Sequence, residues 1–360
     1  ANSSTVKAQS VNNTEGQWFN QKSLSIAVTE ALDNSQGQLV AGGNTNLSAK
    51  TFNNSAGQVV TSGQLNATVA QALINQQGLI SANEALTVKT GSLDNSKGSV
   101  ASAKDTVSLT ATQAFNNQQG QVSAAKALAV SAGSVDNQQG VLSGDTLELT
   151  ATTGQLNNRK GTLLSHANSN INVHGLDNAG GSVHSNGVLS IDTNGLLLDN
   201  QLGKISANTL AVNSGDIHNQ QGLLSANTQA KIDAGNINSQ GGVIQAGNSL
   251  SLNAADVNND EGLIYAQQAD LNVQQLSNQR TKAQETGIQA EQLRISADSL
   301  NNNQGQIVSG QDLPLTVRDS LSNTEGVISS NGVLSIGSDS NTQPSISNNQ
   351  GRIQAAGDVA

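Results

Sequence analysis

The stretch LDNSQGQLVA at residues 32–41 decides the fold, because closely related stretches recur along the whole chain. Each begins with an apolar residue, passes through a polar residue and an asparagine to a glycine, and ends with alternating apolar and small residues. Other copies are LDNSKGSVAS (93–102), VDNQQGVLSG (135–144), VNNDEGLIYA (257–266) and LSNTEGVISS (321–330). Self-similarity at a regular spacing is the sequence signature of a repeat architecture.

The glycine of this pattern sets the period of the repeat, which is about 21 residues. The anchoring glycines are Gly16, Gly37, Gly57, Gly78, Gly98, Gly120, Gly140, Gly161, Gly181, Gly203, Gly222, Gly242, Gly262, Gly305, Gly326 and Gly351. Gly287 is a degenerate further anchor, and the intervals that end at Gly287 and Gly351 are longer than the others. The spacing predicts about seventeen turns of roughly 20–22 residues.

Apolar and polar residues alternate after each glycine, and a second alternating apolar run follows a few residues later. Alternation with period two indicates β-strands, and neither run sustains the helical period. A strand this short cannot bury its apolar face alone, whereas stacked copies form a continuous core. We therefore predict an all-β fold, a parallel β-helix solenoid, with Leu86, Val88, Val100, Val122 and Val130 facing inward.

Each turn needs a corner, and the Asn–x–x–Gly group is expected to supply it, because glycine adopts positive φ at little cost and asparagine tolerates the left-handed region. At the strand spacing of about 4.8 Å, stacked asparagine amides can hydrogen bond in a ladder. The predicted structural ladder is Asn34, Asn54, Asn75, Asn95, Asn117, Asn137, Asn158, Asn178 and Asn200. Asp136, the neighbour of Asn137, is expected to point to solvent.

Composition excludes several classes of function. The net charge of −10 disfavours nucleic acid and anionic membrane surfaces, which both require basic patches. No apolar run is long enough to span a bilayer, so no membrane insertion of this segment is expected. The absence of cysteine excludes disulfides, thiolate metal sites and a cysteine nucleophile. We expect no cofactor, no metal site and no catalytic residue.

One polar column invites a catalytic hypothesis. Four residues before the glycine, consecutive turns carry Asp177, Asp199 and His218, and close carboxylates can divide acid and base roles. A β-helical polysaccharide-active enzyme with an outward carboxylate column is therefore the alternative interpretation. Other turns place Asn or Asp at the same position, which favours a turn role for this column.

Aromatic residues are scarce, with one tryptophan, one tyrosine and three phenylalanines in the chain. Sugar sites commonly stack rings on exposed aromatic side chains, and only Phe19 and Tyr265 are expected to face outward. Dispersed polar contacts therefore fit this sequence better than a dedicated lectin pocket.

Two breaks in the repeat divide the chain into regular repeats at 1–278, a degenerate turn or insertion at 279–290, and repeats at 291–360 with a polar loop at 337–345. The first break loses the Asn–Gly corner and concentrates charge, and loops on solenoids often carry binding. A candidate binding loop therefore contains Arg280, Lys282, Glu285 and Glu291.

The turns LNNQQG-x-[IL]-x-[AS] followed by L-x-[LIV] resemble the haemagglutinin repeats of filamentous haemagglutinin, over essentially the whole chain. The same repeats form the shafts of contact-dependent growth inhibition exoproteins of the CdiA type. This resemblance implies a right-handed β-helix and export by two-partner secretion through an outer-membrane partner transporter of a Gram-negative bacterium. It also implies a virulence-associated, secreted filament on the cell surface.

The resemblance does not separate adhesins from toxin carriers, and both ends of the chain fall within a repeat. We therefore expect a structural shaft segment that supports cell adhesion and projects a distal binding or toxin domain. Its expected partners are the outer-membrane transporter during export and a host or neighbouring bacterial cell surface. We expect no enzymatic activity.

Overall fold

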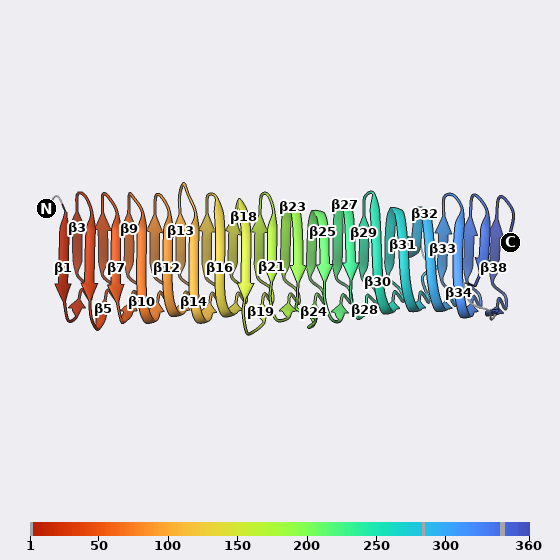
Figure 1. Ribbon diagram of the computed structural model, residues 1–360, viewed down its shortest axis with the longest axis horizontal. Coiled ribbons are helices and arrows are strands. Elements are labelled where there is room, and N and C mark those ends of the chain that lie inside the picture. Colours follow the sequence, from red (N-terminus) through yellow and green to blue (C-terminus); the bar gives the residue numbers. More distant parts are fainter. Residues whose placement is uncertain (1–2, 283–284, 339–342) are drawn as a thin grey trace. The chain divides into compact units, whose positions relative to one another are not determined.

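The computed structural model describes residues 3–282, 285–338 and 343–360. All regular secondary structure in these residues is β-strand, and no helix occurs among them. Contacts divide the chain into two compact units. The first contains Ala1–Asp177 and Gly181–Gly187, and the second contains Asn178–Gly180 and Val188–Ala360. Figure 1 shows the strands of each unit lying side by side.

The strands that lie wholly in the first unit are β1 (Ser4–Ala8), β2 (Val11–Asn12), β3 (Gln17–Asn20), β4 (Leu24–Val28), β5 (Ala31–Asp33), β6 (Gln38–Ala41), β7 (Thr45–Ala49), β8 (Thr51–Asn53), β9 (Gln58–Thr61), β10 (Leu65–Ile74), β11 (Leu79–Ala82), β12 (Leu86–Asp94), β13 (Ser99–Ser102), β14 (Val107–Asn116), β15 (Gln121–Ala124), β16 (Ala127–Asp136), β17 (Val141–Gly144), β18 (Thr146–Ala151), β19 (Leu156–Asn157), β20 (Thr162–Ser165), β21 (Ser169–Asn172) and β22 (Leu176–Asp177).

The remaining strands are β23 (Ser182–Asp192), β24 (Leu198–Asp199), β25 (Lys204–Asn213), β26 (Ile217–His218), β27 (Leu223–Asp233), β28 (Asn236–Asn238), β29 (Val243–Ala246), β30 (Ser249–Asn258), β31 (Leu263–Ser277), β32 (Gly287–Asn301), β33 (Gln306–Ser309), β34 (Leu313–Ser322), β35 (Val327–Ser330), β36 (Leu334–Gly337), β37 (Ser345–Ser347) and β38 (Arg352–Ala355).

Each strand pairs in parallel with the strand at the same position one turn later. In the first unit, β11 pairs with β13, β13 with β15 and β15 with β17, so the strand after each corner stacks on its own copy. The second apolar run stacks in the same way, with β12 on β14 and β14 on β16. The second unit repeats the pattern from β25 to β27 to β29. This confirms the predicted all-β parallel solenoid of about seventeen turns.

The core consists of stacked aliphatic side chains that alternate along each strand. β4 shows the alternation, with Leu24, Ile26 and Val28 buried and the residues between them half-buried. The five residues expected inside are 0–2% exposed: Leu86 0%, Val88 0%, Val100 0%, Val122 0% and Val130 2%. Burial of such side chains stabilises a fold by about 1.5–3 kcal/mol each, which explains why apolar residues recur at the inward positions of the strands.

The corner is a tight turn, and it corrects our expectation about glycine. In the turn Asn34–Gly37, the Gly37 amide donates to the Asn34 carbonyl at 3.0 Å. The left-handed residue is Gln36, with φ of 56°, one position before the glycine. A Cβ on Gly37 would lie 2.1 Å from the Asn13 carbonyl oxygen of the preceding turn. Glycine is therefore required by the close approach of the neighbouring turn and not by positive φ.

The first break in the repeat also differs from expectation, because the corner is retained. Asn278 keeps its place in the asparagine column, and Arg280 has the positive φ of 54° that marks a corner. Thr281 stands where glycine is usual, and its hydroxyl donates to the Asn278 carbonyl at 3.1 Å. Gly287 is no anchor, because it pairs with Leu263 at the start of the next strand.

The extra residues of this break therefore follow the corner. Regular strand pairing resumes at Gly287, and Ile288 is the fully buried residue of the next strand. Within the predicted irregular segment 279–290, the corner at Arg280 is retained and strand pairing resumes at Gly287, whereas residues 283–284 lie outside the described residues. Most of the polar loop at 337–345 also lies outside them.

Candidate functional site

The dominant polar feature of the molecule is a column of asparagine side chains buried at the corner. In a representative turn, the Asn34 Nδ2 donates to Asn54 Oδ1 at 2.7 Å. The same nitrogen also lies 3.3 Å from the Gly37 carbonyl oxygen and 3.1 Å from the Gln58 carbonyl oxygen. Each side chain thus links its own corner to the next turn by its amide group.

All nine asparagines predicted for the ladder lie at this position and are fully buried. In the first unit the Nδ2-to-Oδ1 distances are 2.7 Å from Asn34 to Asn54, Asn54 to Asn75, Asn75 to Asn95, Asn95 to Asn117 and Asn117 to Asn137, and 2.8 Å from Asn137 to Asn158. In the second unit the corresponding distance from Asn178 to Asn200 is 2.8 Å. A buried amide that is fully hydrogen bonded avoids the desolvation cost of an unpaired polar group.

The ladder extends beyond the nine predicted asparagines in both directions. Further members are Asn13, Asn219, Asn259, Asn278, Asn302, Asn323 and Asn348. All except Asn278 stand three residues before an anchoring glycine, so the same spacing rule identifies them. The spacing rule does not identify Asn278, because Thr281 stands in place of the glycine three residues later.

One position interrupts the ladder in the second unit. Ser239 takes the place of an asparagine, and its Oγ accepts a hydrogen bond from Asn219 Nδ2 at 3.0 Å. The shorter side chain does not continue the column, because the buried Asn259 Oδ1 has no hydrogen-bond partner among the described residues. Ser239 and Asn259 are both fully buried. An unsatisfied buried acceptor costs roughly 1–3 kcal/mol, so this turn is a local weak point.

Replacing Ser239 with asparagine should repair the ladder. The new amide would donate to Asn259 Oδ1 and accept from Asn219 Nδ2, as in the neighbouring turns. We expect the free energy of unfolding, measured by urea denaturation, to rise by about 1 kcal/mol.

The matched control for this repair is Ser239→Ala, which removes one of the two acceptors of Asn219 Nδ2 and should lower the free energy of unfolding. A Ser239→Asn variant that is less stable than the parent would contradict the assignment of Asn259 Oδ1 as an unpaired acceptor.

A second polar column stands next to the ladder at the surface. Asp136 is half-buried, and its Oδ1 accepts from the Gln138 amide and from Asn157 Nδ2, each at 3.0 Å. Its Oδ2 accepts from Gln118 Nε2 at 2.6 Å. Asp136 thus lies at the surface, as expected, but its carboxylate also holds the corner and links neighbouring turns.

The carboxylate column considered for catalysis has the same turn-stabilising contacts. Asp199 Oδ1 accepts from the Gln201 amide of its own corner at 3.0 Å. Asp177 pairs with Arg159 of the preceding turn, with 2.9 Å between the Arg159 Nη1 and the carboxylate. His218 lies beside Asp199 in the strand pairing. These contacts match the role of Asn and Asp in other turns.

The charged residues near the first break are engaged within the chain. Arg280 forms ion pairs with Asp260 at 3.3 Å and with Glu261 at 2.8 Å, and the Glu261 hydrogen bond raises the pKa of its guanidinium. Lys282 Nζ donates to the Glu325 carbonyl at 3.0 Å. Glu285 is exposed with φ of 62°. Glu291 accepts from Gln311 Nε2 at 3.4 Å, so the four residues do not converge on one site.

No set of three or more His, Cys, Asp or Glu side chains within residues 3–282, 285–338 and 343–360 could hold a metal ion. No helix in those residues is long and apolar enough to cross a membrane. The asparagine ladder is thus the site that the geometry defines, and its chemistry is the joining of one turn to the next.

These features define a class of structural β-solenoids in which each turn contacts its neighbours and the same hydrogen-bonded corner recurs from turn to turn. A family model described as the haemagglutinin repeat matches residues 1–73, 60–119, 106–153, 143–200, 187–240, 206–287 and 289–360. The chain therefore belongs to the haemagglutinin-repeat family and is an adhesin-like structural shaft. No curated protein and no solved structure matches it significantly.

Proposed function

We propose that this chain is a shaft segment of a secreted filamentous adhesin or contact-dependent inhibition exoprotein on the surface of a Gram-negative bacterium. The shaft carries a distal binding or toxin domain away from the cell and supports adhesion to a host or neighbouring bacterial surface. The observation that carries this proposal is the ladder, since its hydrogen-bonded asparagines join each turn to the next.

Export through an outer-membrane partner transporter fits the same features. The chain has no cysteine, so no disulfide forms before the chain passes an outer-membrane pore. Each turn pairs mainly with the turns before and after it, so folding can propagate one turn at a time as the chain emerges. Membership of the haemagglutinin-repeat family supports this two-partner route.

The division of the chain follows from this role. We propose regular repeats over 1–278, an insertion within 279–290, and further repeats over 291–360 with a polar loop at 337–345. Lys282 and Glu285 are both exposed between the corner at Arg280 and the strand that begins at Gly287. We propose these two as the part of the candidate binding loop that a partner could reach, since Arg280 is held by two carboxylates.

A deletion of whole turns tests the role as a spacer. Deletion of residues 79–120 from the parent exoprotein joins Gly78 to Gln121 and removes two complete turns, because Leu79, Ser99 and Gln121 occupy successive positions of one column. Asn75 would then stack on Asn137. We expect surface amount, measured by antibody labelling of whole cells, within about twofold of the parent, because solenoid turns are modular.

The matched control deletes residues 79–109, which ends within a turn and puts β-strand residues out of register. Surface amount should then fall by about tenfold, because a shifted register exposes the apolar face. If these turns act only as a spacer, the 79–120 deletion should also retain the adhesion or target-cell inhibition of the parent. Normal display with complete loss of that activity would contradict the proposal and assign a specific site to these turns.

A further inference from the structure

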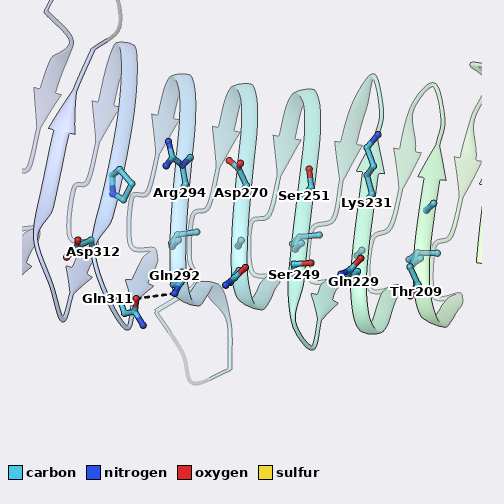
Figure 2. Close-up of a pocket in the computed structure, with 18 residues that line it drawn as sticks. Thr209, Gln229, Lys231, Ser249, Ser251, Asp270, Gln292, Arg294, Gln311 and Asp312 are labelled. Carbon is cyan, nitrogen blue, oxygen red and sulfur yellow. Dashed lines mark hydrogen bonds between the residues drawn. The ribbon is translucent and has the colours of Figure 1, made fainter. Parts of the chain in front are cut away.

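A long groove crosses the second unit along the direction in which its turns stack. It has a volume of about 670 Å³ and lies across β25, β27, β30, β31 and β32, with its end against β34. Figure 2 shows its two walls as rows of outward side chains, one residue from each strand in each row. None of the residues that line the groove belongs to the asparagine ladder.

The strand register explains the two rows. One wall contains Thr209, Gln229, Ser249, Gln268 and Gln292, which pair in succession from strand to strand. The other wall contains Ala211, Lys231, Ser251, Asp270 and Arg294, which pair in the same way two residues further along each strand. The inward residues between the walls, such as Leu250 and Leu293, are buried, so the floor is mainly strand backbone.

The walls offer hydrogen bonds at each turn. Gln229 and Gln268 are exposed, and within the described residues their amides make no side-chain hydrogen bond. At one end, Gln292 Nε2 donates to Gln311 Oε1 at 3.2 Å, and Gln311 Nε2 donates to Glu291 at 3.4 Å. None of the large exposed hydrophobic side chains of the described residues lines the groove. An apolar ligand is therefore disfavoured.

The charges of the groove disfavour a polyanion. Lys231 pairs with Asp233 at 2.9 Å, so its charge is partly neutralised within its own strand. Arg294 is flanked in the register by Asp270, and Asp312 lies at the end of the groove. The two basic and two acidic residues that line the groove and its end leave no net charge, whereas recognition of a polyanion requires an excess of basic groups.

The spacing favours a straight chain of hydroxyl-bearing units. Successive turns repeat at about 4.8 Å, so equivalent amides and hydroxyls recur at that interval along the groove. A β-1,4-linked chain of hexopyranoses is extended and advances by a similar distance per sugar, whereas an α-1,4-linked chain coils. An extended peptide advances by about 3.3 Å per residue and does not match the interval.

We propose that this groove binds a linear, uncharged β-1,4-linked glycan, with one sugar residue against each turn and the Gln229 and Gln268 amides as the main hydrogen-bonding groups. This site is separate from the proposed role as a shaft, since the groove lies on the outer surface and leaves the stacking unchanged.

Isothermal titration of the 360-residue chain with cellohexaose and chitohexaose tests the proposal. At least one of these probes should bind, and maltohexaose, its α-1,4-linked counterpart, should bind at least about tenfold more weakly. The double variant Gln229→Ala/Gln268→Ala should lose about tenfold in affinity, because each lost amide leaves sugar hydroxyls unpaired. Circular dichroism should be unchanged, since both side chains are exposed.

The matched control is Gln64→Ala/Gln113→Ala, which removes two exposed glutamines of the first unit and should leave affinity unchanged. The proposal is overturned if neither β-1,4 hexasaccharide binds at millimolar concentration, or if both double variants bind equally. Binding of a sulfated oligosaccharide or of an extended peptide in place of the neutral glycans would also overturn it. None of these outcomes bears on display of the parent protein, which tests the shaft separately.

Discussion

Replacement of Gly222 by alanine is expected to lower the free energy of unfolding of the second unit by about 3 kcal/mol or more. A Cβ at this corner would lie 2.2 Å from the Asn200 carbonyl oxygen and 2.6 Å from Asn219 Oδ1. The first atom belongs to the backbone of the preceding turn, so it can move only if the stack opens. Urea denaturation followed by circular dichroism measures the loss.

Two variants of the same unit serve as controls. A Cβ on Gly337 would meet no atom within 4 Å, so Gly337→Ala should change stability by no more than about 0.5 kcal/mol. Gln221 has φ of 53°, and Gln221→Gly should not destabilise the unit, because glycine relieves the left-handed strain. If Gln221→Gly were harmful and Gly222→Ala harmless, the close approach of turns would not be the reason for glycine at this corner.

Replacement of Asn137 by alanine is the second substitution expected to lower the free energy of unfolding strongly. Asn137 Nδ2 donates to Asn158 Oδ1 at 2.8 Å and also contacts the Gly140 and Thr162 carbonyls at 3.2 and 3.3 Å. Its Oδ1 accepts from Asn117 at 2.7 Å. The alanine variant leaves buried partners above and below without their hydrogen bonds, and we expect a loss of roughly 1–3 kcal/mol in the free energy of unfolding.

The adjacent Asp136→Ala variant is the matched control. Sequence alone predicts a change within about 0.5 kcal/mol for a solvent-facing residue. Because the carboxylate accepts three hydrogen bonds at the surface, we now expect a loss nearer to about 1 kcal/mol, still smaller than that of Asn137→Ala. A greater loss for Asp136→Ala in urea denaturation would mean that the outer column, and not the buried ladder, holds the corner.

Much of the fold could be predicted because the same residue pattern recurs many times along the chain. Alternation around Val100 and Val122 predicted the inward side chains, and the Asn–x–x–Gly spacing located the ladder. A single copy would not distinguish a strand from other short apolar segments. Because many copies share one register, comparison of the copies identifies the positions that face inward.

The remaining features depend on atoms that meet only after folding. The reason for glycine is a carbonyl of the preceding turn, which no local sequence pattern contains. The corner at Asn278 was missed because a Thr281 hydroxyl replaces the usual glycine, and the register then resumes at Gly287. The groove between Gln229 and Lys231 arises from side chains of separate turns, each unremarkable within its own repeat.

A double-mutant cycle between Asn117 and Asn137 tests the central claim most directly, because these amides share one hydrogen bond of 2.7 Å. The free energies of unfolding of both single variants to alanine and of the double variant give the coupling between the two side chains. The ladder predicts coupling of about 0.5–3 kcal/mol for this pair, and additivity within about 0.5 kcal/mol for Asn54 and Asn137, which do not touch. Additive losses for Asn117 and Asn137 would show that the asparagines act singly and that no ladder joins the turns.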